Sequence, residues 1–448
     1  MKQRLLISGI FLLLFSMVKG QSYFSPLIGD LPAMTEVRQV SLGFTGWGSS
    51  GSASALFFNP AQIGLTGNKM TVYGGFTGAF IKEKRSFPVQ DSFGDFLADN
   101  SYVVTSNLFP GFQAGINYRL FPKLTFALAY QHATERDFRY EEEVRGSVFG
   151  QYNRDPLVGF HRISSTGTTS NLAFGTACRL FKPIWLGASM QLVLPGDFQD
   201  KYEIQVIHES VNLASDQTIS YQSEPQIDPR VIANLGLTID LSKHLTIATS
   251  YKFSNKSVQQ NGLVHLISDS TAMLPVLSVD STFAITKVTF NNPAEWRIGL
   301  SLKPVNIIPT ELFLEFVYQA WSNYSAKYEF KPDVDLSGIP TDFYETSFKL
   351  KDVWKVHVGV EHRFFSGVPF RIGFYFDPSP IDPGMDRNWF TAGTGYQWDR
   401  LTLEVAGAFT NSEYQYPDLF PITGEERIEN DTVRNGYLVG MLTLKYSF

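Results

Sequence analysis

Charged side chains that could do chemistry gather in the second half of the chain, where they alternate with apolar residues. Paired carboxylates can exchange protons with a substrate as general acid and base. No nucleophile elbow, base-activated nucleophile or haem-attachment motif accompanies them, so the sequence predicts no enzyme. Because structural ion-pair networks are common, we expect a salt-bridge network instead. Its predicted members are Glu295, Arg297, Lys303, Glu311, Glu315, Lys355, Glu361, Arg363, Arg371 and Glu404.

The residue spacing supports neither a metal site nor a cofactor site. His357 and His362 are five residues apart, so on a strand they face opposite sides, and the seven histidines show no zinc-ligand spacing. The run from Gly46 to Gly51 matches a dinucleotide fingerprint only formally, because no strand precedes it and no helix follows it. The only cysteine, Cys178, excludes an intramolecular disulfide. A net charge of −6 without a basic patch gives no indication of nucleic-acid binding.

The elements that must position these residues are segments of about ten residues in which apolar and polar side chains alternate with a period of two, the pattern of membrane-spanning strands. Their side chains also explain the 15% of aromatic residues, because membrane barrels carry aromatic girdles at both interfaces. Fourteen such segments are predicted, near residues 70–81, 112–119, 124–131, 171–180, 184–194, 231–240, 245–253, 295–303, 311–319, 353–363, 370–377, 388–398, 401–409 and 436–448.

The two faces of each segment differ in a way that fits a barrel in a membrane. In the segment at 295–303, Trp296 and Ile298 take one register while Glu295 and Arg297 take the other. We assign the apolar register to lipid and the charged one to the lumen, because a midplane lysine or arginine facing lipid costs about 2–4 kcal/mol. A soluble antiparallel sandwich also alternates, but it does not explain the other features of the chain.

Connection lengths set the expected topology. Short connections (120–123, 181–183, 241–244, 304–310, 364–369 and 399–400) alternate with longer ones, of which 82–110, 132–170, 195–230, 254–294 and 320–352 are the largest. Short periplasmic turns alternating with long extracellular loops are typical of outer-membrane barrels. The sequence therefore predicts an all-β protein, a fourteen-stranded antiparallel barrel with both chain ends in the periplasm.

The chain ends complete this picture. Residues 1–20 are predicted to be a signal peptide, with Lys2 and Arg4 before an apolar run that is too short to span a bilayer. Residues 21–69, rich in Gly, Ser and Ala, are predicted to be a plug, or hatch, inside the lumen of a barrel formed by residues 70–448. We expect the charge network to grip this hatch. The chain ends on an aromatic, Phe448, which resembles the C-terminal signal of Gram-negative outer-membrane proteins.

One long connection carries much apolar surface, which needs either cover or a ligand. The two interpretations, packing on neighbouring connections and capture of a hydrophobic ligand, both stay open. The residues of this predicted ligand-capture loop are Leu263, Leu266, Ile267, Leu274 and Leu277.

Two stretches resemble the FadL/TodX family of outer-membrane transporters of long-chain fatty acids and aromatic hydrocarbons. The first is Asn59-Pro60-Ala61, which matches the Asn-Pro-Ala motif of the family's N-terminal hatch. By turn chemistry alone it reads equally well as a turn into the first strand. The second runs from Arg371 to Tyr396 and is similar to the family's late strand, Pro-rich loop and Asp-Arg start of the next strand.

The resemblance implies passive uptake of a hydrophobic small molecule, such as a long-chain fatty acid, through the outer membrane of a Gram-negative bacterium, without a cofactor. The lipid of that membrane is then the barrel's surrounding partner. An alternative is a barrel of the same shape that binds proteins of a secretion machinery. A general hydrophilic porin is disfavoured by the long plug.

Overall fold

The computed structural model describes residues 31–448 except 32, 91–92, 94, 136–137, 147–155, 262–284, 306, 333–344, 348–349, 417–418 and 421–429. Within these ranges no helix is both long enough and apolar enough to cross a membrane.

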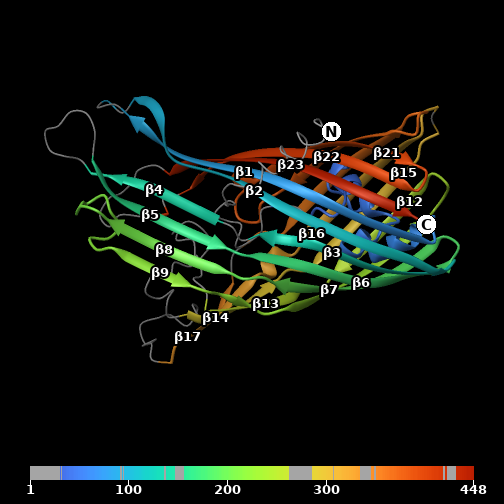
Figure 1. Ribbon diagram of the computed structural model, residues 1–448, viewed down its shortest axis with the longest axis horizontal. Helices are drawn as coiled ribbons and strands as arrows, with labels where there is room; N and C mark the ends of the chain where they lie inside the picture. The colour runs from blue at the N-terminus through green and yellow to red at the C-terminus, as the bar shows by residue number, and fades with distance from the viewer. Residues whose placement is uncertain are drawn as a thin grey trace, which may run out of the picture.

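Fourteen antiparallel strands close into a barrel, in which the last strand pairs with the first (Figure 1). All fourteen predicted segments are strands of this barrel, so the predicted fold class is confirmed. In order around the wall the strands are β1 (Met70–Gln90), β2 (Phe96–Phe121), β3 (Leu124–Glu135), β6 (Thr168–Phe181), β7 (Ile184–Pro195), β11 (Arg230–Asp240), β12 (Leu245–Lys252), β15 (Glu295–Leu302), β16 (Thr310–Gln319), β19 (Val353–Arg363), β20 (Pro369–Asp377), β21 (Arg387–Trp398), β22 (Leu401–Tyr416) and β23 (Asp431–Ser447).

The alternation of side chains follows the predicted parity. On β15, Trp296 and Ile298 are 41% and 38% exposed on the outer face, whereas Glu295 is buried on the inner face. The free cysteine, Cys178, is exposed on β6, as expected for the lipid-facing register. The apolar girdle therefore faces outward and the charged residues face the lumen, which is the arrangement that a surrounding bilayer stabilises.

The long connections correct one prediction. Their residues were expected to be loops, but β1 and β2 continue beyond the barrel as a hairpin, and two more sheets form at the same end, called here the loop end. One sheet has the order β4-β5-β8-β9 and the other β10-β13-β14-β17-β18 (Figure 1). Their strands are β4 (Phe138–Arg145), β5 (Leu157–Thr166), β8 (Gln199–Val206), β9 (Ile219–Ser223), β10 (Gln226–Ile227), β13 (Asn255–Gln260), β14 (Ile285–Asn292), β17 (Ser325–Phe330) and β18 (Glu345–Ser347).

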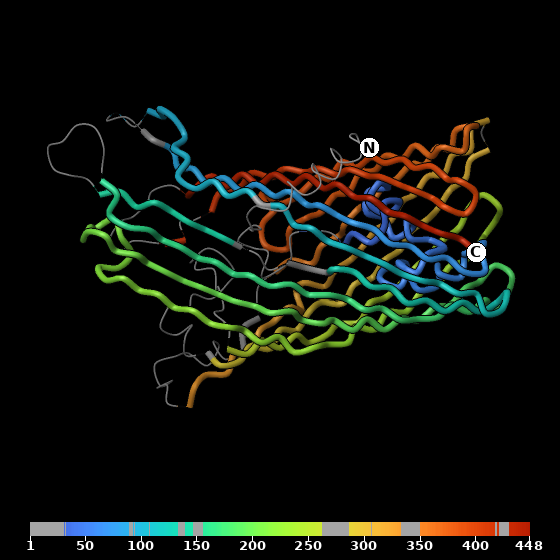
Figure 2. The backbone as a smooth tube through the Cα atoms, viewed as in Figure 1, coloured from blue at the N-terminus to red at the C-terminus, as the bar shows by residue number. Residues whose placement is uncertain are grey.

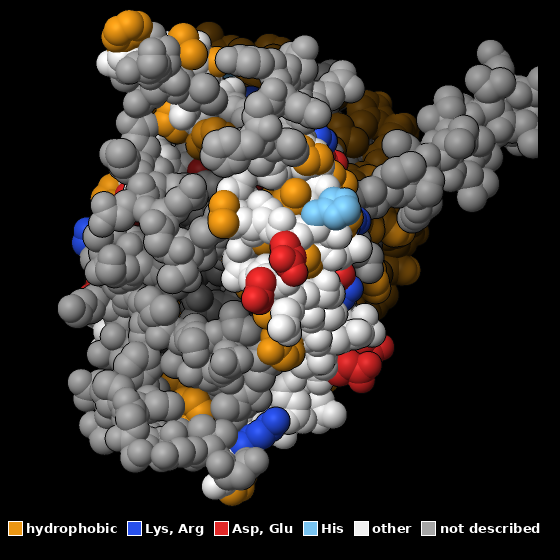
Figure 3. Space-filling model, turned by 90° about the vertical axis from the view of Figure 1, so that its left-hand side faces the viewer, with side chains coloured by type: hydrophobic (Ala, Val, Ile, Leu, Met, Phe, Trp, Pro, Cys, Tyr) orange, Lys and Arg blue, Asp and Glu red, His pale blue; other side chains and the backbone are white. Residues whose placement is uncertain are grey.

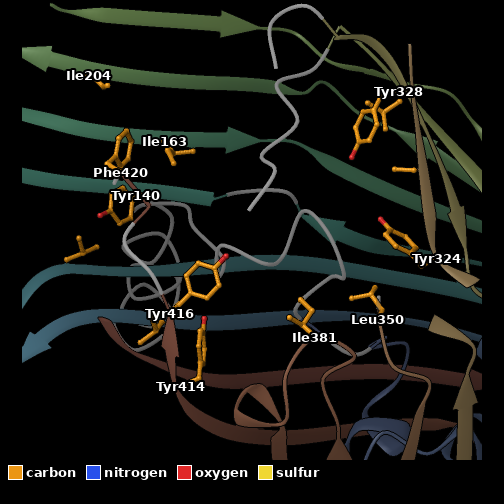
Figure 4. Close-up of a cluster of buried hydrophobic side chains, with 14 residues drawn as sticks. Tyr140, Ile163, Ile204, Tyr324, Tyr328, Leu350, Ile381, Tyr414, Tyr416 and Phe420 are labelled. Carbon is orange, nitrogen blue, oxygen red and sulfur yellow. The ribbon is translucent and has the colours of Figure 1, made fainter. Parts of the chain in front are cut away.

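A cluster of aromatic and aliphatic side chains ties these sheets to the barrel. Tyr140 and Ile163 come from one sheet, Tyr328 from the other and Tyr414 from the extension of β22, and all are buried in one cluster (Figure 4). Phe420 stacks on Tyr140 and His161, with ring centroids 5.7 and 4.5 Å apart. Seen from the loop end, described hydrophobic side chains lie in separate patches among charged ones (Figure 3).

The hatch lies inside the barrel, toward the opposite end, called here the turn end (Figure 2). Its described residues form one short helix and three 3-10 turns, because their glycines and Pro60 interrupt any longer helix. The elements are α3 (Val37–Ser41), η1 (Gly46–Ser49), η2 (Ala53–Phe57) and η3 (Pro60–Leu65); two more turns, η4 (Trp321–Asn323) and η6 (Pro383–Met385), lie outside the hatch. The helix α3 contacts β21 and β22, while η3 contacts β6 and β7 on the other side of the ring, so the hatch bridges the lumen.

Candidate functional site: the hatch and the cavity beside it

The Asn-Pro-Ala segment joins the hatch to the barrel wall. Asn59 precedes η3, and its side-chain oxygen accepts a hydrogen bond from the backbone nitrogen of Ala61 at 3.1 Å, with Pro60 as the first residue of the turn. Its Nδ2 donates to the carbonyls of Leu237 and Thr249 on the wall, at 3.3 and 3.1 Å. The motif is therefore both a turn and a contact between the hatch and the wall, because the Asn59 side chain caps the turn and also hydrogen-bonds to wall carbonyls.

Two wall glycines make this contact possible. A Cβ on Gly236 would lie 2.0 Å from Oδ1 of Asn59, and one on Gly187 would lie 2.3 Å from the nitrogen of Ala61. These two glycines are paired across β11 and β7. Any larger residue at either position would displace the motif, because real Cβ contacts are never so short. Lumen-facing glycines also admit the hatch on other strands, namely Gly115, Gly175, Gly299, Gly359, Gly373 and Gly393.

The predicted charge network divides into groups, two of which hold the hatch. In the first group, Arg38 of α3 lies 2.9 Å from Glu361, which also pairs with Arg371 at 2.6 Å. Arg371 continues to Glu404 at 2.7 Å. Arg38 is a partner that sequence reasoning missed, because a five-residue helix gives no periodic signal.

In the second group, Arg297 pairs with Glu295 and Glu315 at 2.8 and 2.9 Å, and Glu315 accepts a hydrogen bond from the backbone nitrogen of Gly46 at 3.2 Å. Lys355 does not belong to either group; it pairs with Asp377 at 2.8 Å within the wall. Three other predicted members lie nearer the turn end and join the first group. Glu311 lies 3.8 Å from Arg38 and pairs with Lys303 at 3.5 Å, and Arg363 pairs with Glu361 at 3.5 Å.

A third contact, also missed, centres on Glu36 of the hatch. Its side chain is fully buried and lies 2.7 Å from Nζ of Lys445 on β23. Ser52 and Ser54 of the hatch both donate hydrogen bonds to its Oε1, the latter at 2.6 Å. A buried carboxylate needs such partners, since breaking a buried ion pair costs about 3–5 kcal/mol. Glu36 thus binds the hatch to the wall and also stabilises the fold of the hatch.

A cavity of about 220 Å³ lies inside the barrel against the hatch. Phe44, Phe57 and Phe58 of the hatch form its apolar side. The wall side is polar and comes from strands on both halves of the ring, with Gln131 and Asn171 on one half and Lys355 on the other. The lumen beside the hatch therefore keeps room for a small molecular group.

Neither a metal site nor the proposed capture loop adds to this site. No group of three or more histidine, cysteine or carboxylate side chains that could hold a metal occurs among the described residues. His357 is buried in the lumen and His362 bonds Thr310, so the two do not converge. The predicted capture loop with Leu263, Leu266, Ile267, Leu274 and Leu277 lies outside the described residues.

Comparison with known proteins agrees with this geometry. Residues 230–448 match the model of the family described as outer membrane protein transport protein (OMPP1/FadL/TodX). A solved Pseudomonas aeruginosa FadL homologue is 13% identical, with a TM-score of 0.59 over 93% of this chain and 99% of that chain. The Pseudomonas putida toluene transporter TodX is 14% identical, with a TM-score of 0.55 over 94% of this chain and 99% of that chain. The Ralstonia pickettii toluene transporter TbuX is 15% identical, with a TM-score of 0.53 over 94% of this chain and 99% of that chain.

No curated protein matches the chain. The family match and the shared fold confirm the predicted resemblance, and with it the outer membrane of a Gram-negative bacterium as the protein's location.

Proposed function

We propose, from the premise that this is an outer-membrane barrel of the FadL/TodX type, that it takes up hydrophobic molecules passively, with long-chain fatty acids or similar compounds as the class. The observation that carries the proposal is the match of residues 230–448 to a family of outer-membrane transport proteins. In this scheme residues 1–20 direct export, residues 21–69 form the hatch and residues 70–448 form the barrel.

The proposed route of the hydrophobic ligand runs through the lumen. The ligand would arrive at the loop end, reach the cavity beside Phe44, Phe57 and Phe58, and pass after the hatch shifts. Burial of the ligand's carbons supplies about 0.8 kcal/mol per CH₂. In this scheme the protein supplies apolar surfaces along the route and forms no covalent bond with the ligand. Net transport therefore runs down the concentration gradient of the ligand.

Two kinds of contact hold the hatch to the wall. Its apolar side chains, such as Leu56 and Phe44, are buried against wall residues, and discrete ion pairs and the Asn59 hydrogen bonds fix its position. A shift of the hatch by a small distance would exchange these contacts while the barrel stays intact, because the barrel is stabilised by its own strand pairing.

Uptake by whole cells tests the proposal. Cells lacking other fatty-acid transporters would express the full chain, and the initial rates of uptake of a radiolabelled long-chain fatty acid, of a long-chain alcohol and of toluene would be measured. We expect uptake of at least one compound above that of cells without the protein. A blocked variant, Asn171→Trp, should lose it because the indole fills the cavity, whereas Phe174→Trp on the lipid face of the same strand should not.

Uptake of none of the three compounds by the unaltered protein would contradict the proposal. Co-purification of secretion proteins in the same cells would then favour the alternative role as a protein-binding barrel.

A further inference from the structure

Polar side-chain atoms line the cavity against the hatch, and a plain hydrocarbon could not form hydrogen bonds with them. Gln131 and Asn171 are directly paired across β3 and β6, and both line the cavity. Gln131 is only 3% exposed, and its Oε1 has no hydrogen-bond partner within the described chain; Oδ1 of Asn171 is likewise buried without one. A buried polar atom left without a partner costs about 1–3 kcal/mol. Two neighbouring amides are thus prepared for a polar group that enters the cavity.

A third polar atom lies on the other side of the lumen. His357 is 4% exposed and its Nδ1 lies 2.8 Å from the carbonyl oxygen of Gly43 in the hatch. A carbonyl only accepts, so Nδ1 carries the proton and, in the neutral imidazole, Nε2 is an acceptor. In the part of the chain that the structure describes, Nε2 of His357 has no partner. It is fixed in orientation by stacking on Tyr375, with ring centroids 4.2 Å apart.

The charges that line the cavity are already neutralised. Lys252 lies 3.9 Å from Glu295, Arg297 bonds Glu295 and Glu315, and Lys355 lies 2.8 Å from Asp377. Each of the three cations therefore has a carboxylate within ion-pair distance. A ligand carboxylate would have to displace one of these partners, and it would bring only acceptors to a histidine nitrogen that is itself an acceptor.

From these groups we infer that the cavity binds the neutral, hydrogen-bonding head of an amphipathic molecule, a hydroxyl or a primary or secondary amide, whose hydrocarbon tail lies on the aromatic side of the hatch. A hydroxyl or an N–H donates to Nε2 of His357 or to an amide oxygen, and its own oxygen accepts from an amide nitrogen of Gln131 or Asn171. Phe57 and Phe58 provide the surface for the tail. The inference rests on the proposed function and narrows its ligand class, from long-chain fatty acids and similar hydrophobic compounds to their neutral relatives, long-chain alcohols and amides.

The selectivity expected from this arrangement is substantial. A ligand that makes two hydrogen bonds to neutral partners gains about 0.5–1.5 kcal/mol from each, and each 1.4 kcal/mol is tenfold in affinity. A site built to bond a hydroxyl also rejects analogues that lack it, because its polar groups are then left unpaired. We therefore expect dodecan-1-ol to bind at least about fivefold more tightly than dodecane or dodecanoate.

Direct binding tests the inference on the unaltered full chain. The purified protein in an amphipol would be immobilised, and the binding of tritiated dodecan-1-ol, dodecanoate and dodecane at pH 8 would be measured by scintillation proximity. Preference for dodecan-1-ol by about fivefold or more supports the inference. Equal or tighter binding of dodecanoate or dodecane would refute it and leave the proposed function standing, whereas binding of none of the three would count against both.

Two variants separate the cavity amides from other lumen amides. Gln131→Leu combined with Asn171→Leu should lower the affinity for dodecan-1-ol at least about fivefold and leave that for dodecane unchanged or higher. Gln113→Leu is the matched control, because Gln113 is equally buried on the next strand but does not line the cavity. An unchanged affinity of the double variant for dodecan-1-ol would overturn the inference. If the double variant fails to fold, the comparison of the three ligands on the unaltered chain still decides the question.

Discussion

Arg38 offers the sharpest test of how the hatch is held. Its guanidinium bonds Glu361 of the wall at 2.9 Å, and Nη1 also donates to the hatch carbonyls of Trp47 and Gly48. Arg38→Met keeps the length of the stem and removes the charge. Breaking a buried pair costs about 3–5 kcal/mol, and the lower value applies here because Glu361 keeps Arg371 at 2.6 Å. A loss of about 3 kcal/mol corresponds to roughly a hundredfold rise in the population of displaced hatches.

Ion conductance in planar bilayers measures that population. Single channels of the Arg38→Met protein should open about a hundredfold more often than those of the unaltered protein, while the barrel should keep its heat-modifiable mobility in gels. Arg363→Met is the control, because Arg363 also pairs with Glu361, at 3.5 Å, but is 48% exposed and does not touch the hatch. An exposed pair contributes about 0–1 kcal/mol, so its openings should rise fivefold at most. Equal opening frequencies for Arg38→Met and the unaltered protein would refute the assigned role of this ion pair.

Three more predictions follow from the same geometry. Deletion of residues 21–67 behind an intact signal peptide should leave a folded barrel that conducts ions continuously, because a lumen of this strand number admits water once emptied; conductance as low as that of the intact protein would show that another segment closes the pore. Gly236→Ala should raise the frequency of channel openings, because the added Cβ would lie 2.0 Å from Oδ1 of Asn59. Gly436→Ala is the control and should not raise it, because its Cβ would meet no atom within 4 Å. Equal opening frequencies of the two variants would contradict the role of the contact between Gly236 and Asn59. In a Cys178→Ser background, an impermeant thiol reagent on whole cells should label a cysteine at the exposed Val211 of the loop end but not one at Lys243 of the turn end; the opposite labelling would invert the topology.

The barrel could be predicted from sequence because its physics is local and periodic. On β15 and β19 each residue either faces lipid or faces the lumen, so the positions of Trp296 and Glu361 follow from a period of two. Strand pairing then follows from connection lengths, since neighbours in sequence joined by short turns must be antiparallel neighbours in space.

The sequence did not reveal the sheets at the loop end, because polar and apolar residues alternate in them as in any solvent-exposed segment. In β5 the buried positions include Val158, His161 and Ile163, a mixture without an apolar stripe. The burial of His161 arises from Phe420, more than 250 residues away, and no local pattern signals such a contact. Predicting loops there was wrong because the stabilising partners are distant in sequence.

The hatch contacts were partly visible in the sequence. The Asn-Pro-Ala motif was found, but Glu36 and Arg38 were not, because their partners Lys445 and Glu361 lie on the far part of the chain. A usable signal existed in the wall: glycines at lumen-facing positions in mid-strand, such as Gly236, weaken a strand unless something approaches closely.

The central claim, that a hydrophobic molecule occupies the lumen beside the hatch, is tested most directly by mass spectrometry of small molecules that co-purify with the full-length protein. Extraction in a mild detergent should retain an amphipathic compound in near-stoichiometric amount, and the Asn171→Trp protein, purified identically, should lack it. The Phe174→Trp protein should retain the compound, because its substitution faces lipid. The same small-molecule content in all three proteins, or none in the unaltered one, would contradict the account.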